Sequence, residues 1–211
     1  MSECLGIDIS HWNQIINYNK ICDQVDFIIL KAGGSEGRSP YLYYKDECFD
    51  HNYKEFHDKR GINVGCYYFV GRGFISVERG VRDAEHFLSI IKGKKFEYPV
   101  IIDLEATIPK DKAGATDAVK AFCNKLEKEG YYAMIYASDI SGFKDRLNAS
   151  MLTDYDKWVA RYGSQPTYIK DWGIWQKSSK GMITGIQGYV DLDVCRKSYP
   201  AIIRRAGLNG Y

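Results

Sequence analysis

Apolar stretches alternate with segments of helical periodicity along the first two thirds of this 211-residue chain. The stretches with the pattern of buried strands are Leu5–Ser10, Val25–Gly33, Asn63–Val70, Tyr98–Glu105 and Tyr131–Ser138. Between several of them, apolar residues recur every three or four positions, which is typical of amphipathic helices. Because strands that alternate with helices pair in parallel, this order predicts an α/β protein built on a parallel sheet.

The pattern changes after Ser138. Three further strands are predicted over Lys157–Tyr162, Trp172–Gln176 and Val190–Val194. The connections between them are roughly ten residues long, which is too short for full crossover helices. Eight candidate strands in a chain near the lower size limit of the eight-stranded α/β barrel favour a barrel that lacks several outer helices. The length suits one domain, and we expect residues 1–211 to fold as a single unit.

Charge and composition exclude several classes of partner. A formal net charge of +2 is too mild for nucleic-acid binding, and no stretch approaches the ~20 apolar residues of a membrane span, so we expect neither nucleic acid nor membrane insertion. The amino terminus has no basic region and no apolar signal core, which predicts synthesis in the cytoplasm. The six cysteines are far apart, and we expect them to be reduced thiols.

Two carboxyl groups stand at the end of the fourth predicted strand. Asp103 and Glu105 are separated by one residue and follow an apolar run. Because side chains alternate along a strand, both point to the same side, with Cα atoms roughly 6.5 Å apart. Such a pair raises the pKa of both groups and lowers stability unless it has a use. The alternative interpretation is a pair of solvated acids.

Further acids fall on other strands. Asp8 ends the first strand, and Asp191, followed two residues later by Asp193, belongs to the last. In α/β barrels, chemistry gathers at the carboxyl ends of the strands. Such acids could hold magnesium or manganese for phosphoester chemistry, or serve as general acid and partner in glycoside cleavage. The chain has only four histidines, and we expect no metal and no other cofactor.

Glycoside cleavage requires a carboxylic acid that keeps its proton near neutral pH. Raising the pKa of a glutamic acid from about 4.3 to about 6 needs roughly 2–3 kcal/mol, which neighbouring carboxylates and a desolvating aromatic wall could supply. Four aromatic residues near predicted strand ends are candidates for this wall, and each could equally be a core residue. These residues are Tyr67, Tyr136, Tyr162 and Trp175.

Seven short segments along the chain form an ordered set of motifs. They are Leu5–Trp12, Val64–Phe69, Pro99–Glu105, Ile135–Ser138, Trp158–Tyr162, Trp175–Gln176 and Val190–Asp193. In this order they resemble glycoside hydrolase family 25, the muramidase-type lysozymes, over nearly the whole chain. The most specific parts are Asp-x-Glu at the end of the fourth strand and Val-Asp-x-Asp in the last. The chain departs from the family pattern at Tyr68, where many relatives have histidine, and in the longer loop Ala32–Gly37.

The resemblance implies that one catalytic domain hydrolyses the β-1,4 bond between N-acetylmuramic acid and N-acetylglucosamine in bacterial peptidoglycan. It implies an irregular TIM-like barrel of five strand–helix units followed by three strands with short connections. Glu105 would be the protonated general acid, with ionised aspartates behind it. Asp103 would either assist the substrate's acetamido group or stabilise a cationic transition state, and Asp8 and Asp191 would flank the sugar. Tyr67 and Tyr136 would contact the substrate.

Two other functions are also compatible with the sequence. One is a catalytically silent module that binds the cell wall, and the other is a metal-dependent hydrolase that uses the same acid cluster. A protein made without a visible signal peptide would act on the wall after release from the cell. Many relatives also carry a separate cell-wall-binding domain, and we expect such a domain as a partner that this sequence does not include.

Overall fold

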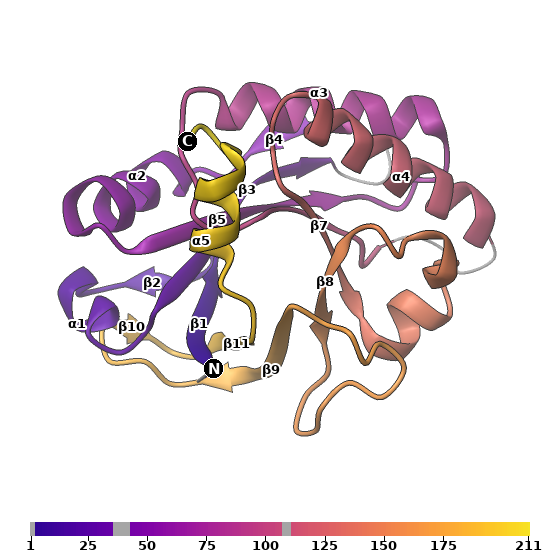
Figure 1. Cartoon of the computed structure of the whole chain (residues 1–211). Helices are drawn as coiled ribbons and strands as arrows, with labels where there is room; N and C mark the ends of the chain where they lie inside the picture. Colours follow the sequence, from indigo (N-terminus) through magenta and orange to yellow (C-terminus); the bar gives the residue numbers. More distant parts are fainter. Residues whose placement is uncertain (1–2, 36–42, 107–110) are drawn as a thin grey trace.

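A closed barrel of eight strands forms the centre of the computed structural model, which describes residues 3–35, 43–106 and 111–211 (Figure 1). The barrel strands are β1 (Cys4–Ile9), β3 (Phe27–Ser35), β5 (Asn63–Val70), β6 (Val100–Asp103), β7 (Ala133–Ser138), β8 (Asp156–Ala160), β9 (Ile174–Gly181) and β11 (Val190–Cys195). The ring closes at β1, which pairs with β3 on one side and with β11 on the other. The predicted TIM-like barrel is therefore confirmed.

The direction of the last strand differs from that of the others. Neighbouring strands from β1 through β3, β5, β6, β7 and β8 to β9 run parallel, whereas β11 is antiparallel to both β9 and β1. We expected the last three strands to pair differently, and of these three β11 is the one that does. Its reversed direction brings its first residues to the barrel end where the parallel strands finish, so that Asp191 lies opposite Asp8.

Helical segments follow the first five barrel strands, as predicted. They are α1 (Tyr18–Cys22), α2 (Phe49–Tyr53) with its continuation η1 (Lys54–Asp58), α3 (Val77–Ile91), α4 (Lys112–Lys128) and η2 (Asp139–Lys144). The two long helices, α3 and α4, lie side by side on the outside of the barrel (Figure 1). The Ser76 hydroxyl caps α3 by accepting a hydrogen bond from the Arg79 amide at 3.2 Å. After the short η3 (Ala149–Met151), residues 152–198 contain no helix.

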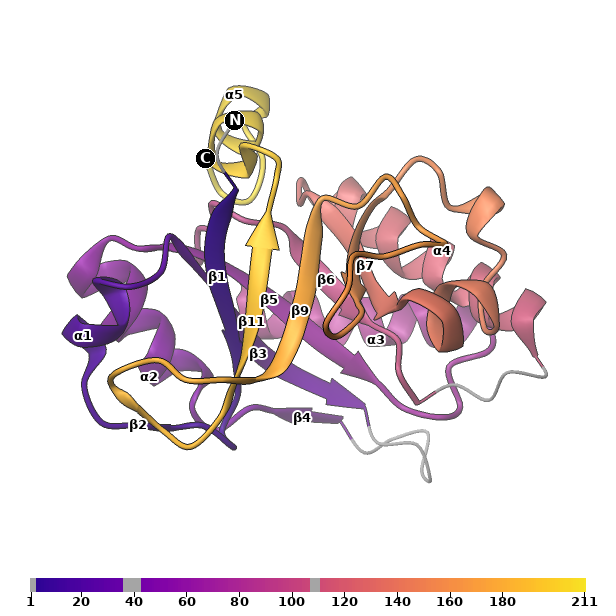
Figure 2. The same cartoon turned by 90° about the horizontal axis from the view of Figure 1, so that it is seen from below.

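The remaining elements extend or close the barrel. The strand β4 (Tyr43–Lys45) pairs with the end of β3, and β2 (Gln14–Ile15) pairs with β10 (Ile186–Gln187). The helix α5 (Tyr199–Ala206) lies at the end of the barrel where β1 begins (Figure 2). Because β3 continues to Ser35, part of the expected loop Ala32–Gly37 is strand, and its last residues lie outside the described ranges.

Strand alternation separates two cores. One fills the barrel interior with residues such as Phe27, Tyr98 and Trp158, and the other lies between the barrel and its helices. Gly6 belongs to the interior face, where a Cβ atom would stand 2.3 Å from the Phe27 ring. Tyr68 belongs to the outer core, with its hydroxyl oxygen 2.9 Å from His86 Nδ1. Every second residue of a strand therefore reaches the interior.

No helix in the described parts of the chain combines the length and the apolar character that crossing a bilayer requires.

Candidate active site

Acidic and aromatic side chains surround a cavity of about 210 Å³ inside the barrel. We call it the acid-lined cavity, and its walls are formed by Asp8, Tyr67, Asp103, Glu105, Tyr136, Trp158, Tyr162, Gln176, Ser179 and Asp191. Seven of the eight candidate residues from the sequence are in this set. They come from β1, β5, β6, β7, β11 and the segments that follow β6 and β8, so that residues distant in sequence meet at one end of the barrel.

The position of the acid pair follows from strand alternation. Ile101 and Asp103 face the barrel interior, whereas Ile102 and Leu104 are buried in the outer core. Glu105 continues the interior face just beyond the last residue of β6, and it is exposed at the mouth of the cavity. Asp103 is only 3% exposed. The two side chains therefore share one face of the strand, as their spacing in the sequence predicted. One of them, Asp103, is buried, and the other, Glu105, is accessible.

A chain of hydrogen bonds fixes Asp8. The side-chain oxygen of Gln176 accepts hydrogen bonds from the hydroxyls of Tyr136 at 2.9 Å and Tyr162 at 3.2 Å. This leaves the Gln176 amide NH2 to donate to Asp8 Oδ2 at 2.7 Å. Because both hydroxyl donors select the orientation of the amide, Asp8 is held in a single position opposite Asp191.

Aromatic rings form the inner wall of the cavity. The Trp158 ring is 4.4 Å from the Tyr136 ring and meets the Tyr67 ring edge-on at 6.1 Å, measured between centroids. The Trp158 indole also donates a hydrogen bond to Asp193 Oδ1 at 2.8 Å. Asp193 lies deeper in the barrel than Asp191, and its other oxygen has no hydrogen-bond partner among the described residues. The wall therefore combines apolar ring faces with polar edges.

Trp175 is the candidate that the structure does not bring into the cavity. Its indole packs against Trp172, with 5.9 Å between the ring centroids, and donates a hydrogen bond to the Arg161 carbonyl at 2.7 Å. The side chain belongs to the outer core. The expectation that Trp175 forms part of the aromatic wall is corrected, because in β9 the interior positions are Ile174 and Gln176.

The structure adds wall residues that the sequence analysis did not single out. These are Gln176 and Trp158 on the barrel strands and Ser179 further along β9. Gln176 was within a family-like segment, but its role depends on two tyrosines more than ten residues away in sequence. Strand periodicity gave two possible faces for β9, and only the register with β8 and β11 decides between them.

Burial raises the pKa of the deep carboxyl groups. The pKa of Asp103 is well above its usual range because the side chain is desolvated and Glu105 is nearby. Asp8 is shifted in the same direction by desolvation and by the charges of Asp193, Asp191 and Asp103. Burial raises the pKa of Asp193 to about 8. Among the aspartates expected to be ionised, burial therefore shifts the deep ones toward their neutral forms.

The two carboxyl groups at the cavity mouth are shifted less. Burial, with a smaller contribution from Glu105, raises the pKa of Asp191 to about 6. Desolvation also raises the pKa of Glu105, against the hydrogen bond with Asp103 and the positive charges of Lys31 and Arg146. Lys31, on β3, lies near the acid pair, with its ammonium 5.1 Å from the Phe69 ring centroid and 5.9 Å from that of Tyr67. The cavity thus holds both protonated and ionised carboxyl groups near neutral pH.

In the described ranges, no group of three or more His, Cys, Asp and Glu side chains has the arrangement of a metal site. The cavity brings together an accessible carboxylic acid, Glu105, and a second carboxyl group at its mouth, Asp191, and groups of this kind can transfer protons and stabilise positive charge.

Known proteins share this sequence pattern and this barrel. The family model described as "Glycosyl hydrolases family 25" matches residues 7–186. The autolytic lysozyme of Clostridium acetobutylicum is 29% identical over 193 residues, which cover 89% of this chain and 54% of the relative. This chain therefore spans about half the length of that relative.

Solved structures extend the likeness to three dimensions. The CTP1L endolysin superposes with a TM-score of 0.80 at 27% identity, covering 96% of this chain and 70% of that chain. The bacterial lysozyme from Streptomyces coelicolor superposes with a TM-score of 0.78 at 24% identity and covers 98% of both chains, which shows a common fold. Since the family model spans most of the sequence, including Asp8, Asp103 and Glu105, the chain belongs to glycosyl hydrolase family 25.

Proposed function

We propose that this chain is a peptidoglycan muramidase that cleaves the β-1,4 bond between N-acetylmuramic acid and N-acetylglucosamine. Family membership and relatives named as lysozymes support a glycoside hydrolase of this kind. The observation that carries the proposal is the position of Glu105. It is an accessible carboxylic acid with a raised pKa, at the mouth of a cavity that offers ring faces and hydroxyl groups to a sugar.

Glu105 donates a proton to the oxygen that leaves the cleaved bond. Asp103 lies behind it and is hydrogen-bonded to it, so that the pair keeps a proton between them when solvated carboxyl groups have lost theirs. Only Glu105 is exposed, which makes it the member of the pair that reaches the substrate. Asp103 supports this step from behind, and it also remains a candidate to assist the acetamido group.

Asp191 stabilises the positive charge that develops on the sugar. With a pKa of about 6, it is mainly ionised at neutral pH, whereas Asp8 favours its neutral form. Asp191 also lies at the cavity mouth within electrostatic reach of Glu105. Asp8, held by Gln176, positions the sugar through hydrogen bonds. This assigns the charge-stabilising role to Asp191 rather than to the buried Asp103.

The test is Glu105→Gln in a cell-wall clearing assay with analysis of the released sugars. We expect clearing to fall by about 10²–10⁴-fold, with wall binding and melting temperature unchanged, because the amide cannot donate the required proton. Glu129→Gln, on the exposed surface just after α4, is the matched control and should clear normally. Near-native clearing by Glu105→Gln would remove the acid assignment, and a new reducing end on glucosamine would remove the muramidase assignment.

Wall-binding and wall-clearing assays on the unmodified protein distinguish the muramidase from the other two functions. A wall-binding module would bind walls without clearing them. A metal-dependent hydrolase would lose its activity after treatment with a chelator such as EDTA and regain it when magnesium or manganese is restored. The muramidase proposed here clears walls equally well before and after chelation, because its acid step needs only protein side chains.

We further propose that the chain is made in the cytoplasm and acts on the wall after release, together with a cell-wall-binding domain. All six cysteines are free thiols, a state that fits synthesis in a reducing compartment. Fractionation of producing cells before and after lysis tests the location. Immunodetection of the native product in the same fractions shows whether it carries an additional domain.

A further inference from the structure

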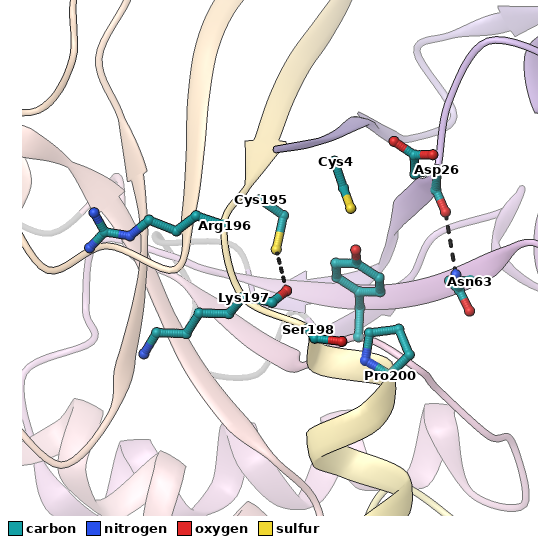
Figure 3. Close-up of a pocket in the computed structure, with 9 residues that line it drawn as sticks. Cys4, Asp26, Asn63, Cys195, Arg196, Lys197, Ser198 and Pro200 are labelled. Atoms are coloured by element: carbon teal, nitrogen blue, oxygen red, sulfur yellow. Dashed lines mark hydrogen bonds between the residues drawn. The ribbon is translucent and has the colours of Figure 1, made fainter. Parts of the chain in front are cut away.

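A second cavity, of about 400 Å³, opens at the amino end of the barrel, the end opposite the acid-lined cavity (Figure 3). We call it the thiol cavity, and its walls include Cys4, Asp26, Asn63, Tyr98, Cys195 and Lys197. None of these residues takes part in the proposed hydrolysis. Two of them are cysteines, one on the first strand of the barrel and one on the last.

Cys4 and Cys195 are register partners in the antiparallel pair of β1 and β11. Directly opposed residues in such a pair have Cα atoms about 4.5–5.5 Å apart, and disulfides join Cα atoms about 4.4–6.8 Å apart. Opposed residues also project from the same face of the sheet, and Figure 3 shows both side chains at the thiol cavity. The backbone therefore already has the spacing that a disulfide needs.

The two thiols differ in accessibility. Cys4 is partly exposed, whereas Cys195 is 1% exposed and donates a hydrogen bond through Sγ to the Lys197 carbonyl at 3.1 Å. Desolvation raises the pKa of the Cys4 thiol and raises that of Cys195 to about 12, although a hydrogen bond with Tyr98 lowers both. An external reagent therefore meets Cys4 first, and the reaction is favoured by mildly alkaline conditions.

We propose that Cys4 and Cys195 form an oxidisable dithiol that closes to a disulfide between the first and last strands of the barrel. The oxidant is a small-molecule disulfide of the glutathione type. The Cys4 thiolate attacks one of its sulfur atoms, forms a mixed disulfide and releases one thiolate. Cys195 then loses its proton to solvent and attacks the Cys4 sulfur, which releases the second thiolate. The protein loses two electrons and two protons, and the oxidant is reduced to two thiols.

The bond would join strands that are almost the whole chain apart in sequence. The β1–β11 pairing closes the barrel, and such distant pairings carry a high loop-closure entropy. A covalent link at this position restricts the unfolded chain while leaving the native register unchanged. We expect oxidation to raise the melting temperature by about 4–16 °C.

The experiment treats the folded full chain with oxidised glutathione at mildly alkaline pH, blocks remaining thiols by alkylation, and maps the peptides by mass spectrometry without reduction. We expect the Cys4 and Cys195 peptides to become linked and the melting temperature to rise. Cys195→Ser should stop at a stable mixed disulfide on Cys4. Replacing Cys22 and Cys48 with serine is the control that should leave the link and the temperature shift unchanged.

Several results would overturn the proposal. One is a stable mixed disulfide on Cys4 in the unmodified protein, and another is no reaction while the thiols titrate normally after unfolding. A third is a link that involves any other cysteine. Because Cys66 and Cys123 are fully buried in the outer core, their reaction would show that the protein had opened before it was oxidised. None of these readouts depends on wall hydrolysis, so they stand apart from the test of the muramidase assignment.

Discussion

The two ends of the barrel interior are built by the same strands but filled by opposite kinds of side chain. At the amino end, Phe27 stacks on Tyr98 with 4.3 Å between ring centroids and an interplanar angle of 10°, and Tyr199 of α5 packs against Tyr98. At the carboxyl end, successive interior positions of the strands become carboxyl groups such as Asp8 and Asp103. The aromatic packing and the carboxyl groups thus lie at opposite ends of the barrel axis.

Buried carboxyl groups at the carboxyl end of the barrel lower the stability of the fold. Asp103 Oδ1 and Asp193 Oδ2 are buried without a hydrogen-bond partner among the described residues, which disfavours the folded state when these groups are ionised. Aromatic and aliphatic packing at the amino end stabilises the fold in compensation.

Replacing Asp191 with asparagine tests the chemistry of the carboxyl end. We expect kcat/KM to fall by about 10²–10³-fold, because the variant lacks the ionised group that we propose stabilises the charge on the sugar. In the unmodified protein, activity should fall as the pH drops through about 6, where Asp191 takes up a proton. It should also fall on the alkaline side, where Asp103 and Glu105 lose their shared proton. A pH–rate profile of Asp191→Asn that keeps the acidic limb would contradict the assignment.

Replacing Asp193 with asparagine tests how much a buried carboxyl group at the carboxyl end destabilises the fold. The pKa of Asp193 is 3.8 unperturbed and about 8 in the folded protein. Its contribution to the free energy of unfolding is therefore fully present below pH 3.8 and is lost as the pH rises through about 8. Asparagine stays neutral and can still accept the Trp158 hydrogen bond. We expect the free energy of unfolding at pH 7 to rise by about 2–4 kcal/mol, with little change near pH 4. Denaturant titrations that show equal effects at both pH values would refute this.

Replacing Gly6 with alanine tests the packed end. The new methyl group would stand 2.3–2.5 Å from three atoms of the Phe27 ring, and the stacked Tyr98 leaves that ring little room to move. We expect a loss of about 1–3 kcal/mol in the free energy of unfolding, measured by chemical denaturation. Gly73→Ala is the matched control, since its nearest neighbour, Arg79 Nη1, is 3.6 Å away. Combining Gly6→Ala with Phe27→Leu should recover part of the loss.

Replacing Trp175 with phenylalanine should have the smallest effect on activity. The side chain lies outside the barrel, away from the acid-lined cavity, so kcat/KM should stay within about threefold of the unmodified value. Trp158→Phe is the inside counterpart and should reduce kcat/KM more, because it makes a wall ring smaller and removes the hydrogen bond to Asp193. If the two variants ranked the other way in steady-state assays, the orientation of β9 would be in question.

The sequence by itself determined the eight strands and the common face of Asp103 and Glu105. These properties depend on local periodicity, because alternation along a strand requires no knowledge of distant residues. For the same reason, seven of the eight candidate site residues could be found near strand ends before the fold was known.

Only the tertiary structure decided which face of each strand is inside and which distant residues meet. Periodicity offers two faces for β9, and barrel closure selects Gln176 over Trp175. The reversed direction of β11 sets Asp191 opposite Asp8 and Cys4 opposite Cys195. The protonation of the deep aspartates also depends on desolvation by residues from many strands. Register and burial are properties of the closed barrel, and no local stretch of sequence contains them.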